Sequence, residues 1–349
     1  MPGPKHSVLK RIMPQLLILA AALALNVLVF PDFFDIDFRN GRLFGSLIDV
    51  LNRGAPVAIL CIGMTLVIAT RGIDLSVGAV MAIAGATSAA VVTDGHGWGT
   101  ALLAGLCAGA LCGLWNGVLV AVLKIQPIVA TLVLMVAGRG VAQLITEGKI
   151  LTFSNEGLIH LGAGTIAGVP TPILIWMALG ALVILVVRRT ALGMLIESIG
   201  INERSSRLAG INSRVLLVCV YLVSGLCAAL AGVIVAADIK GADANNAGLW
   251  LELDAILAVV IGGNSLLGGR FSILASLLGA LIIQSVNSVI LLSGMPPEFN
   301  LVIKALLILA ILVIQSPRIT YLMYMLRASG PQPQPDTDPL SNSPKEEAR

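Results

Sequence analysis

Long apolar runs recur along the whole 349-residue chain, separated by short polar segments. A helix of about 20 apolar residues is long enough to cross the hydrocarbon core of a bilayer, which is about 30 Å thick. A soluble fold does not account for so many runs, because too little polar surface would remain to face water. The pattern therefore predicts an all-α, polytopic membrane protein with about ten transmembrane helices, at residues 13–30, 54–71, 75–93, 99–122, 127–147, 170–187, 214–237, 253–268, 271–293 and 299–316.

Lysine and arginine are distributed unevenly between the segments that join these spans. With the amino terminus in the cytoplasm, thirteen of them fall inside and five outside, as the positive-inside rule requires. Ten spans then place the carboxyl terminus in the cytoplasm as well. The short, glycine-rich segment 253–268 either crosses or re-enters; re-entry would reverse every later helix, so the charge pattern favours a crossing.

The charge and hydropathy patterns also divide the chain. Residues 1–12 are expected to be a cytoplasmic tail, 13–327 the transmembrane domain and 328–349 a disordered cytoplasmic tail, because the last segment is rich in proline, serine and charge. A short interfacial helix is expected over 43–51 in the first outer loop. All five cysteines lie in apolar runs without metal-ligand spacing, so no metal site is predicted.

A weak internal repeat links the two halves of the chain. The segments 109–127 and 279–296 both begin Gly-Ala-Leu, continue to an asparagine and end at a proline. They are offset by five spans, and an odd offset gives duplicated halves of opposite topology. The repeat suggests two inverted five-helix halves, with chance similarity as the alternative. A second pattern, glycine at every fourth position from 105 to 117, indicates either close helix packing or a flexible pore lining.

Several polar residues fall at bilayer depth, where a charge costs at least about 2.5 kcal/mol. Asp74 follows a glycine between two apolar runs, which predicts a helix interruption; the carboxylate either caps the next helix, lines the pathway, or does both. Arg139 either snorkels outward or pairs with a carboxylate, for which Asp74 and Asp254 are the candidates, and substrate contact is a further alternative. The candidate pathway residues are Asp74, Ser76, Asn116, Arg139, Asp254 and Asn287.

The polar segment 188–214 holds five arginines and two glutamates in a chain that is only 12% charged. Asn202 suits a helix N-cap and Gly210 a C′ position, which predicts a short helix over 203–209. We expect Ile201, Leu208 and Ile211 to form a small apolar contact. The segment is either a docking element for a soluble partner or a solvated connector between two spans. The candidate coupling residues are Glu197, Gly200, Asn202, Glu203, Arg207, Ala209 and Gly210.

The sequence offers no means of using ATP and no catalytic centre. The segment 263–270 imitates the spacing of a phosphate loop but lacks the Lys-Ser/Thr pair that reaches phosphate and magnesium. We therefore expect no cofactor bound by this chain and no enzymatic activity. Energy for active transport would have to come from a partner or from an ion gradient.

Four segments carry a resemblance to a known family: 63–78, 191–211, 252–270 and 302–305. Their order and spacing resemble the permease subunit of bacterial sugar-importing ATP-binding cassette transporters of the ribose, xylose, arabinose and galactose group. The segment 241–250, GADANNAGLW, most resembles the galactofuranose importers within that group.

The resemblance implies a location in the bacterial inner membrane and a set of partners. These are a cytoplasmic ATPase, a periplasmic sugar-binding protein, membrane lipid and a second permease in a heterodimer or homodimer, with no nucleic acid. It also implies that 202–210 docks in the ATPase. An ion-coupled secondary carrier for a small polar solute remains the alternative, since it too would have about ten spans and inverted halves, and a membrane-embedded enzyme is a third.

Overall fold

The structure is a computed structural model, and it describes residues 5–39, 41–294, 296, 299, 301–306 and 309. Internal contacts divide the chain into two units, residues 1–300 and 301–349, and the first unit holds the helix bundle. The tail expected over 328–349 and most of the span expected over 299–316 lie outside the described residues.

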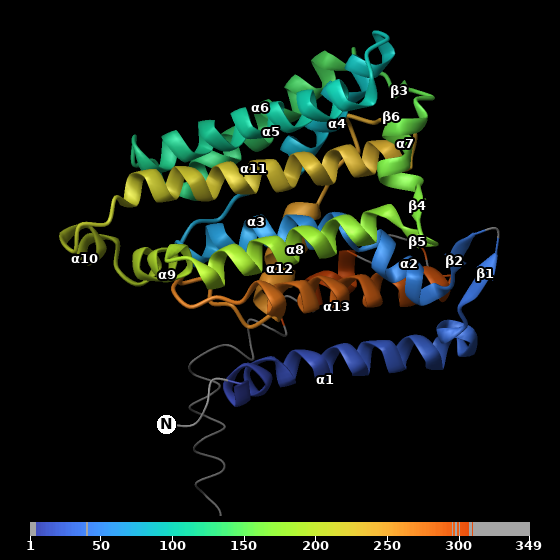
Figure 1. Ribbon diagram of the computed structural model, residues 1–349, viewed down its shortest axis with the longest axis horizontal. Helices are drawn as coiled ribbons and strands as arrows, with labels where there is room; N and C mark the ends of the chain where they lie inside the picture. Colours follow the sequence, from blue (N-terminus) through green and yellow to red (C-terminus); the bar gives the residue numbers. More distant parts are fainter. Residues whose placement is uncertain are drawn as a thin grey trace, which may run out of the picture. The chain divides into compact units, whose positions relative to one another are not determined.

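Helices dominate the described part of the chain, as the apolar runs predict. Long helices lie side by side, with α9 and α10 at one end and short strands, α2 and α7 at the other (Figure 1). The helices are α1 (Lys5–Val29), α2 (Ser46–Arg53), α3 (Ala55–Ala69), α4 (Val77–Thr93), α5 (Trp98–Ala121), α6 (Pro127–Ile145), α7 (Glu156–Ala163), α8 (Thr171–Arg189), α9 (Leu192–Ile201), α10 (Glu203–Leu208), α11 (Ser213–Asp238), α12 (Leu251–Ile261) and α13 (Ile273–Leu292), with a 3₁₀ turn η1 (Pro31–Phe34).

Among the described residues, three two-stranded antiparallel pairs lie at the end opposite α10 (Figure 1). They are β1 (Asp37–Arg39) with β2 (Arg42–Phe44), β3 (Leu151–Thr152) with β6 (Gly241–Ala242), and β4 (Thr165–Ile166) with β5 (Val169–Pro170). The β3–β6 pair joins segments about 90 residues apart in sequence, which fixes the loop before α12 against the loop after α6.

Each of the first nine predicted spans contains a helix. Six described helices are long and apolar enough to cross a membrane by themselves, namely α1, α5, α6, α8, α11 and α13. A seventh arises if α2 and α3, which meet at a bend of 41°, count as one span. The chain is therefore a polytopic membrane protein.

The third and eighth predicted spans differ from most of the others because their helices are short and adjoin non-helical segments. The helix α4 has 17 residues and follows the non-helical segment 70–76, while α12 has 11 residues, or about 16 Å at 1.5 Å per residue. The span expected over 253–268 is thus a short helix followed by a turn-rich segment. Each short helix also follows a non-helical segment, 70–76 before α4 and 239–250 before α12. We call the ranges 70–93 and 239–261, each a non-helical segment with the short helix after it, the interrupted spans.

The buried centre is formed by α3, α4, α5 and α11. Glycines 105, 109, 113 and 117 of α5 face α11 and α4, so that added β-carbons would overlap atoms of Ser88, Ala229, Tyr221 and Val218. Only a residue without a side chain permits this approach. The prediction of packing, rather than a flexible pore lining, is confirmed for this stripe.

Candidate functional site

The carboxylate of Asp74 ties the first interrupted span to two other helices. Asp74 is only 2% exposed. Its Oδ1 accepts hydrogen bonds from the Ser76 amide at 3.0 Å and the Ser76 hydroxyl at 2.6 Å, and its Oδ2 accepts one from the Ser224 hydroxyl of α11 at 2.8 Å. Asn116 of α5 donates to the Ser76 hydroxyl oxygen at 2.8 Å. The four side chains form one buried network.

Asp74 accepts a backbone N–H at the start of α4, as the sequence predicts for a carboxylate near a helix start. The residue that flanks α4 is Ser76, and its own side chain makes no capping bond. The Asp74 carboxylate also accepts from Ser224 on α11, so its role extends beyond the start of α4. Asp74 therefore fixes the interruption in place, and the helix interruption itself is confirmed.

Arg139 on α6 holds the loop of the second interrupted span. Its Nη1 donates to the carbonyl oxygens of Ala244 at 3.1 Å and Ala247 at 2.5 Å. One turn later, Gln143 Nε2 donates to Asn245 Oδ1 at 2.7 Å. The predicted ion pair with Asp74 is wrong, because the Asp74 oxygens are bound by serines. Arg139 instead fastens the loop 239–250 to α6.

The amino-terminal ends of the two short helices meet. Gly78, in the first turn of α4, packs against the backbone of Gly248, two residues before the N-cap of α12. A β-carbon on Gly78 would also lie 2.5 Å from Glu252 Oε2. Glu252 is 3% exposed, and its carboxylate is placed where the positive end of α4 favours a negative charge. Neither Glu252 nor Ser224 is among the site residues predicted from the sequence, because no motif or spacing in either apolar run marks them.

The six predicted pathway residues therefore do not form a single site. Asp74, Ser76 and Asn116 belong to one network, and Arg139 lies against the loop before α12. Asp254 is buried on α12. Asn287 on α13 donates to Gln284 Oε1 of the preceding turn at 3.5 Å. Only the first three are brought together by the fold.

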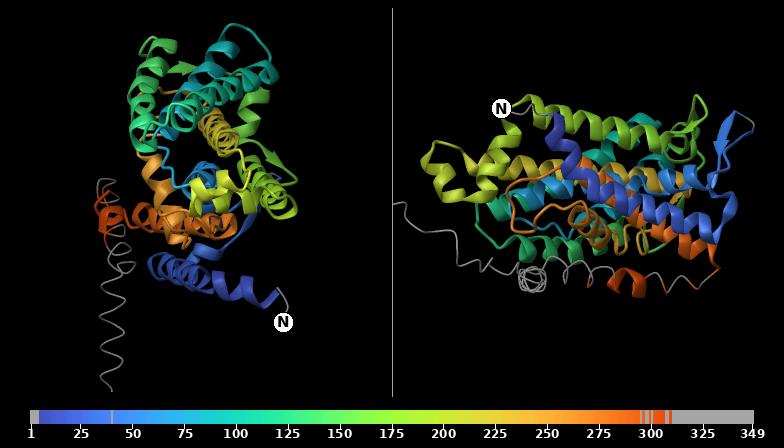
Figure 2. Two further views of the ribbon diagram at one scale, coloured as in Figure 1. Left: turned by 90° about the vertical axis from the view of Figure 1, so that its left-hand side faces the viewer. Right: turned by 90° about the horizontal axis from the view of Figure 1, so that it is seen from below.

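The predicted short helix in the 188–214 segment is present as α10, at the end of the helices that faces the viewer in the left view of Figure 2. Asn202 Oδ1 accepts the Ser205 amide at 3.0 Å, and Gly210 has a φ of +87°. These are the N-cap and the left-handed C-terminal residue that the sequence predicts. Short local signals thus determine this helix.

Glu203 points back toward the helices. Its Oε1 accepts hydrogen bonds from Lys124 Nζ at 2.8 Å and Ser213 Oγ at 3.0 Å, and lies 3.3 Å from Arg207 Nη2. Partial burial alone would raise the pKa of Glu203, but the hydrogen bonds from Lys124 and Ser213 and the two cationic charges outweigh it and lower the pKa below its ordinary value. Glu203 therefore holds α10 to the loop after α5.

The predicted apolar contact between Ile201, Leu208 and Ile211 is wrong. Ile211 packs with the buried cluster of Ala121, Ile199 and Leu217. Leu208, in contrast, is 84% exposed and Ile201 is 60% exposed. Two apolar side chains therefore remain uncovered beside the exposed Arg204 and Arg207.

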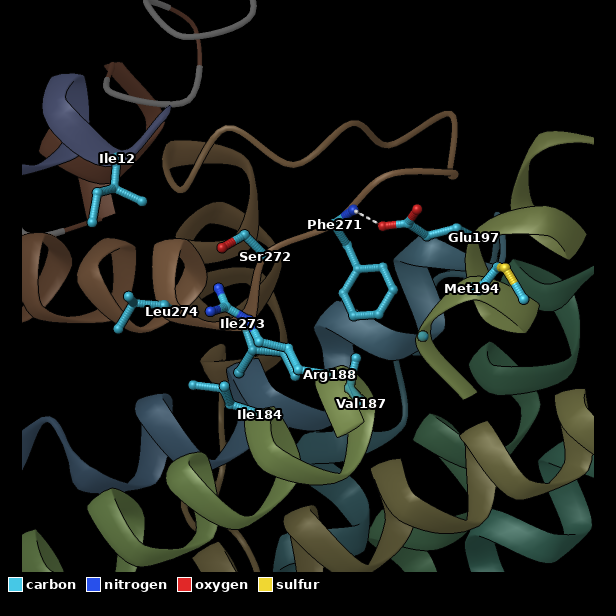
Figure 3. Close-up of a pocket in the computed structure, with 11 residues that line it drawn as sticks. Ile12, Ile184, Val187, Arg188, Met194, Glu197, Phe271, Ser272, Ile273 and Leu274 are labelled. Atoms are coloured by element: carbon cyan, nitrogen blue, oxygen red, sulfur yellow. Dashed lines mark hydrogen bonds between the residues drawn. The ribbon is translucent and has the colours of Figure 1, made fainter. Parts of the chain in front are cut away.

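The other predicted coupling residues divide between two surroundings. Ala209 and Gly210 are exposed, whereas Gly200 is buried against the carbonyl of Ala69. Glu197 borders a cavity of about 530 Å³ between α8, α9 and the start of α13, where its Oε1 lies 3.5 Å from the Phe271 amide nitrogen (Figure 3). Glu197 and Gly200 therefore face the helices, and Arg207, Ala209 and Gly210 face outward.

Comparison with known proteins identifies the class. Residues 46–312 match the family described as the permease component of the branched-chain amino acid transport system. The chain is 60% identical over 316 residues to the galactofuranose transporter permease protein YtfT of Escherichia coli K12, covering 90% of this chain and 93% of that protein. It is 42% identical to the fructose import permease FruF of Bifidobacterium longum, covering 82% and 83%, and 37% identical to the ribose import permease RbsC of Escherichia coli K12, covering 87% and 93%.

No solved structure matches the chain. The family match covers most of the sequence, and the relatives are import permeases that it spans almost end to end. The chain belongs to this family of membrane transport permeases. Within it, the chain is a sugar permease of the ATP-binding cassette importer type.

Proposed function

We propose that this chain forms the pathway for galactofuranose in the bacterial inner membrane, delivered by a periplasmic binding protein and driven by a separate ATPase subunit. The assignment of galactofuranose as the substrate rests on a relative that is 60% identical over nearly the whole chain and is named as a galactofuranose permease. The chain would work beside a second permease, in a heterodimer or a homodimer, and would bind no nucleotide itself.

The observation that carries the mechanism is the meeting of α4 and α12 at Gly78 and Gly248. Short or interrupted spans at corresponding positions of two halves are typical of the substrate pathway in transporters with inverted repeats. The helices of the interrupted spans, α4 and α12, belong to the third and the eighth of the ten proposed crossings, and this offset of five is the one that the repeat predicts. With both termini in the cytoplasm, they would enter from opposite sides and meet within the membrane.

The exposed surface of α10 would bind the ATPase. Leu208 and Ile201 offer apolar area, and Arg204 and Arg207 offer positive charge at its edge. Interfaces bury apolar anchors inside a polar rim. The coupling role of Glu197, Gly200, Asn202 and Glu203 would be to support this surface, since they face the helices or cap α10.

The proposal is tested by purifying the wild-type protein in mild detergent with its genomic neighbours. An ATPase subunit should copurify, and its activity should rise with the binding protein loaded with galactose, which contains the furanose form at equilibrium, but not with ribose. Sugar uptake into vesicles that needs no ATPase and stops when a protonophore is added would instead establish the ion-coupled carrier.

A pair of variants makes the docking surface testable in the same preparation. Leu208→Ser should lose the ATPase, because it removes an exposed apolar anchor. Ile166→Ser is the matched control, since Ile166 is also an exposed apolar side chain, at the opposite end in β4. Equal recovery of the ATPase with both variants would exclude α10 as the docking surface.

A further inference from the structure

Arg71 ends α3 in a conformation that usually belongs to glycine. The Gly72 amide donates to the Val67 carbonyl at 3.0 Å and the Arg71 amide to the Ile68 carbonyl at 2.9 Å. These two bonds define a Schellman motif with Arg71 at C′. Its φ is +65°, a left-handed conformation that is strained for a residue with a side chain. Glycine would form the same turn without strain, so the turn alone does not explain an arginine here.

The side chain explains the choice, because it joins two other segments. Arg71 Nη2 donates to the Ile201 carbonyl at 2.7 Å, and its Nε donates to the Leu267 carbonyl at 2.9 Å. Ile201 is the last residue of α9, so its carbonyl is one of the groups that the helix leaves unpaired. A cation at this end also complements the helix dipole. The left-handed backbone of Arg71 thus aims one guanidinium at two carbonyls.

Close backbone contacts surround this guanidinium. The Gly269 amide donates to the Ala69 carbonyl at 2.9 Å. A β-carbon on Gly200 would overlap the same carbonyl, and one on Gly268 would lie 2.5 Å from Arg71 Cγ. The end of α3, the end of α9 and the turn at 267–269 are therefore packed too tightly to slide independently. We call this group the Arg71 junction.

Asp74 of the buried network lies only three positions after Arg71 in the sequence. On either side of Asp74, the Thr131 hydroxyl of α6 donates to the Ile73 carbonyl at 3.2 Å and accepts the Leu75 amide at 3.1 Å. A cavity of about 280 Å³ borders this segment, lined by Arg71, Gly72, Lys124, Glu203 and Tyr221 among others. The segment 70–76 is thus held at both ends and has open volume beside it.

We propose that Arg71 is the positioning residue through which a displacement of α9 and α10 is passed to the segment 70–76, and so to the meeting point of α4 and α12. The inference rests on the proposed function, since it takes α10 to be the ATPase contact. Arg71 contacts neither the sugar nor the nucleotide in this role. Its removal uncouples ATP hydrolysis from uptake without preventing assembly.

The experiment reconstitutes the purified permease–ATPase complex in proteoliposomes with the binding protein and radiolabelled galactose. Arg71→Gln keeps a donor but loses the charge and the double contact. The ATP hydrolysed per sugar imported should rise by about tenfold, while copurification and ATPase rate remain near wild type. Arg71→Lys, which keeps the charge but reaches one carbonyl, should give an intermediate ratio. Arg270→Gln, an exposed arginine in the adjoining turn, is the control and should leave the ratio unchanged.

A purely structural role would lower abundance, ATPase rate and uptake together, so a parallel fall in all three overturns the proposal. An unchanged ratio in Arg71→Gln also overturns it. If Arg71→Gln does not fold, Arg71→Lys decides, and a wild-type ratio in that variant counts against the proposal. Failure of the wild-type chain to copurify with the ATPase is a different result, which rejects the proposed function itself.

Discussion

Asp74 accepts a hydrogen bond from Ser224, 150 residues later in the chain, at 2.8 Å between Oδ2 and Oγ. This bond crosses from the first interrupted span to the middle of α11, in the second predicted half. An inverted-repeat transporter would need such a contact, because the two halves must move about a shared centre. The bond therefore gives Asp74 a structural role, joining the two predicted halves, in addition to its place among the pathway candidates.

Replacing Asp74 with asparagine should destabilise the protein and reduce uptake. The amide oxygen can replace one of the two carboxylate oxygens as an acceptor. The amide nitrogen is a donor, and it would face a serine hydroxyl that now donates to the carboxylate. Loss of one buried bond of this kind costs about 1–3 kcal/mol. Thermal unfolding in detergent and sugar uptake measure the two effects. Asp94→Asn is the control, because Asp94 is exposed at the end of α4. If Asp74→Asn kept wild-type stability and uptake, Asp74 would have neither a structural role nor a role in the pathway.

Glu203 and Lys124 should act as a coupled pair in uptake. Each single alanine variant is expected to weaken the attachment of α10. The double variant should be little worse than Glu203→Ala alone, because both substitutions remove the same 2.8 Å ion pair. Exposed pairs contribute about 0.2–1 kcal/mol, so membrane insertion should persist. Additive losses in the Glu203→Ala, Lys124→Ala cycle would show that the two residues act separately. The combination of Glu203→Ala with Arg189→Ala is the comparison that should be additive.

The attachment of α10 should be insensitive to pH until strong acidification. The pKa of Glu203 is lowered in the folded protein. A lowered carboxyl pKa contributes stability above the unfolded value of about 4.3, and this is lost as the pH falls through the folded pKa. A spin label can be attached to Leu208→Cys in a protein whose exposed Cys107 and Cys219 are replaced by serine. The mobility of the label should stay constant from neutral pH to about 5 and increase only below about pH 4. Loosening between pH 7 and 6 would contradict this role for Glu203.

Gly200→Ala should disrupt the contact between α9 and α3. Its new methyl group would overlap the Ala69 carbonyl oxygen and crowd the Gly269 amide, so one of the two backbones must move. Gly140→Ala in α6 is the matched control, because no atom lies within 4 Å of the added carbon and alanine favours a helix by about 1 kcal/mol over glycine. Thermal unfolding of the two variants should therefore change in opposite directions. A Gly200→Ala protein as stable as Gly140→Ala would mean that this junction is loose.

The sequence by itself predicts the long helices of the described residues, the glycine stripe on α5 and the capped turn of α10, but not α7 or α9. Each of these predictions depends on local signals, namely a long apolar run, a small residue at every fourth position, or an asparagine and a glycine at the two ends of a short helix. Only the tertiary structure reveals that Asp74 bonds Ser224, that Arg139 binds the carbonyls before α12 and that Leu208 stays exposed. Those outcomes depend on which segments come together in the folded chain. A hydrogen bond between residues 150 positions apart produces no pattern in the sequence of either segment. The interruption at 70–76 could be predicted because glycine and aspartate break an apolar run, but what holds it could not, since the fold chooses those contacts.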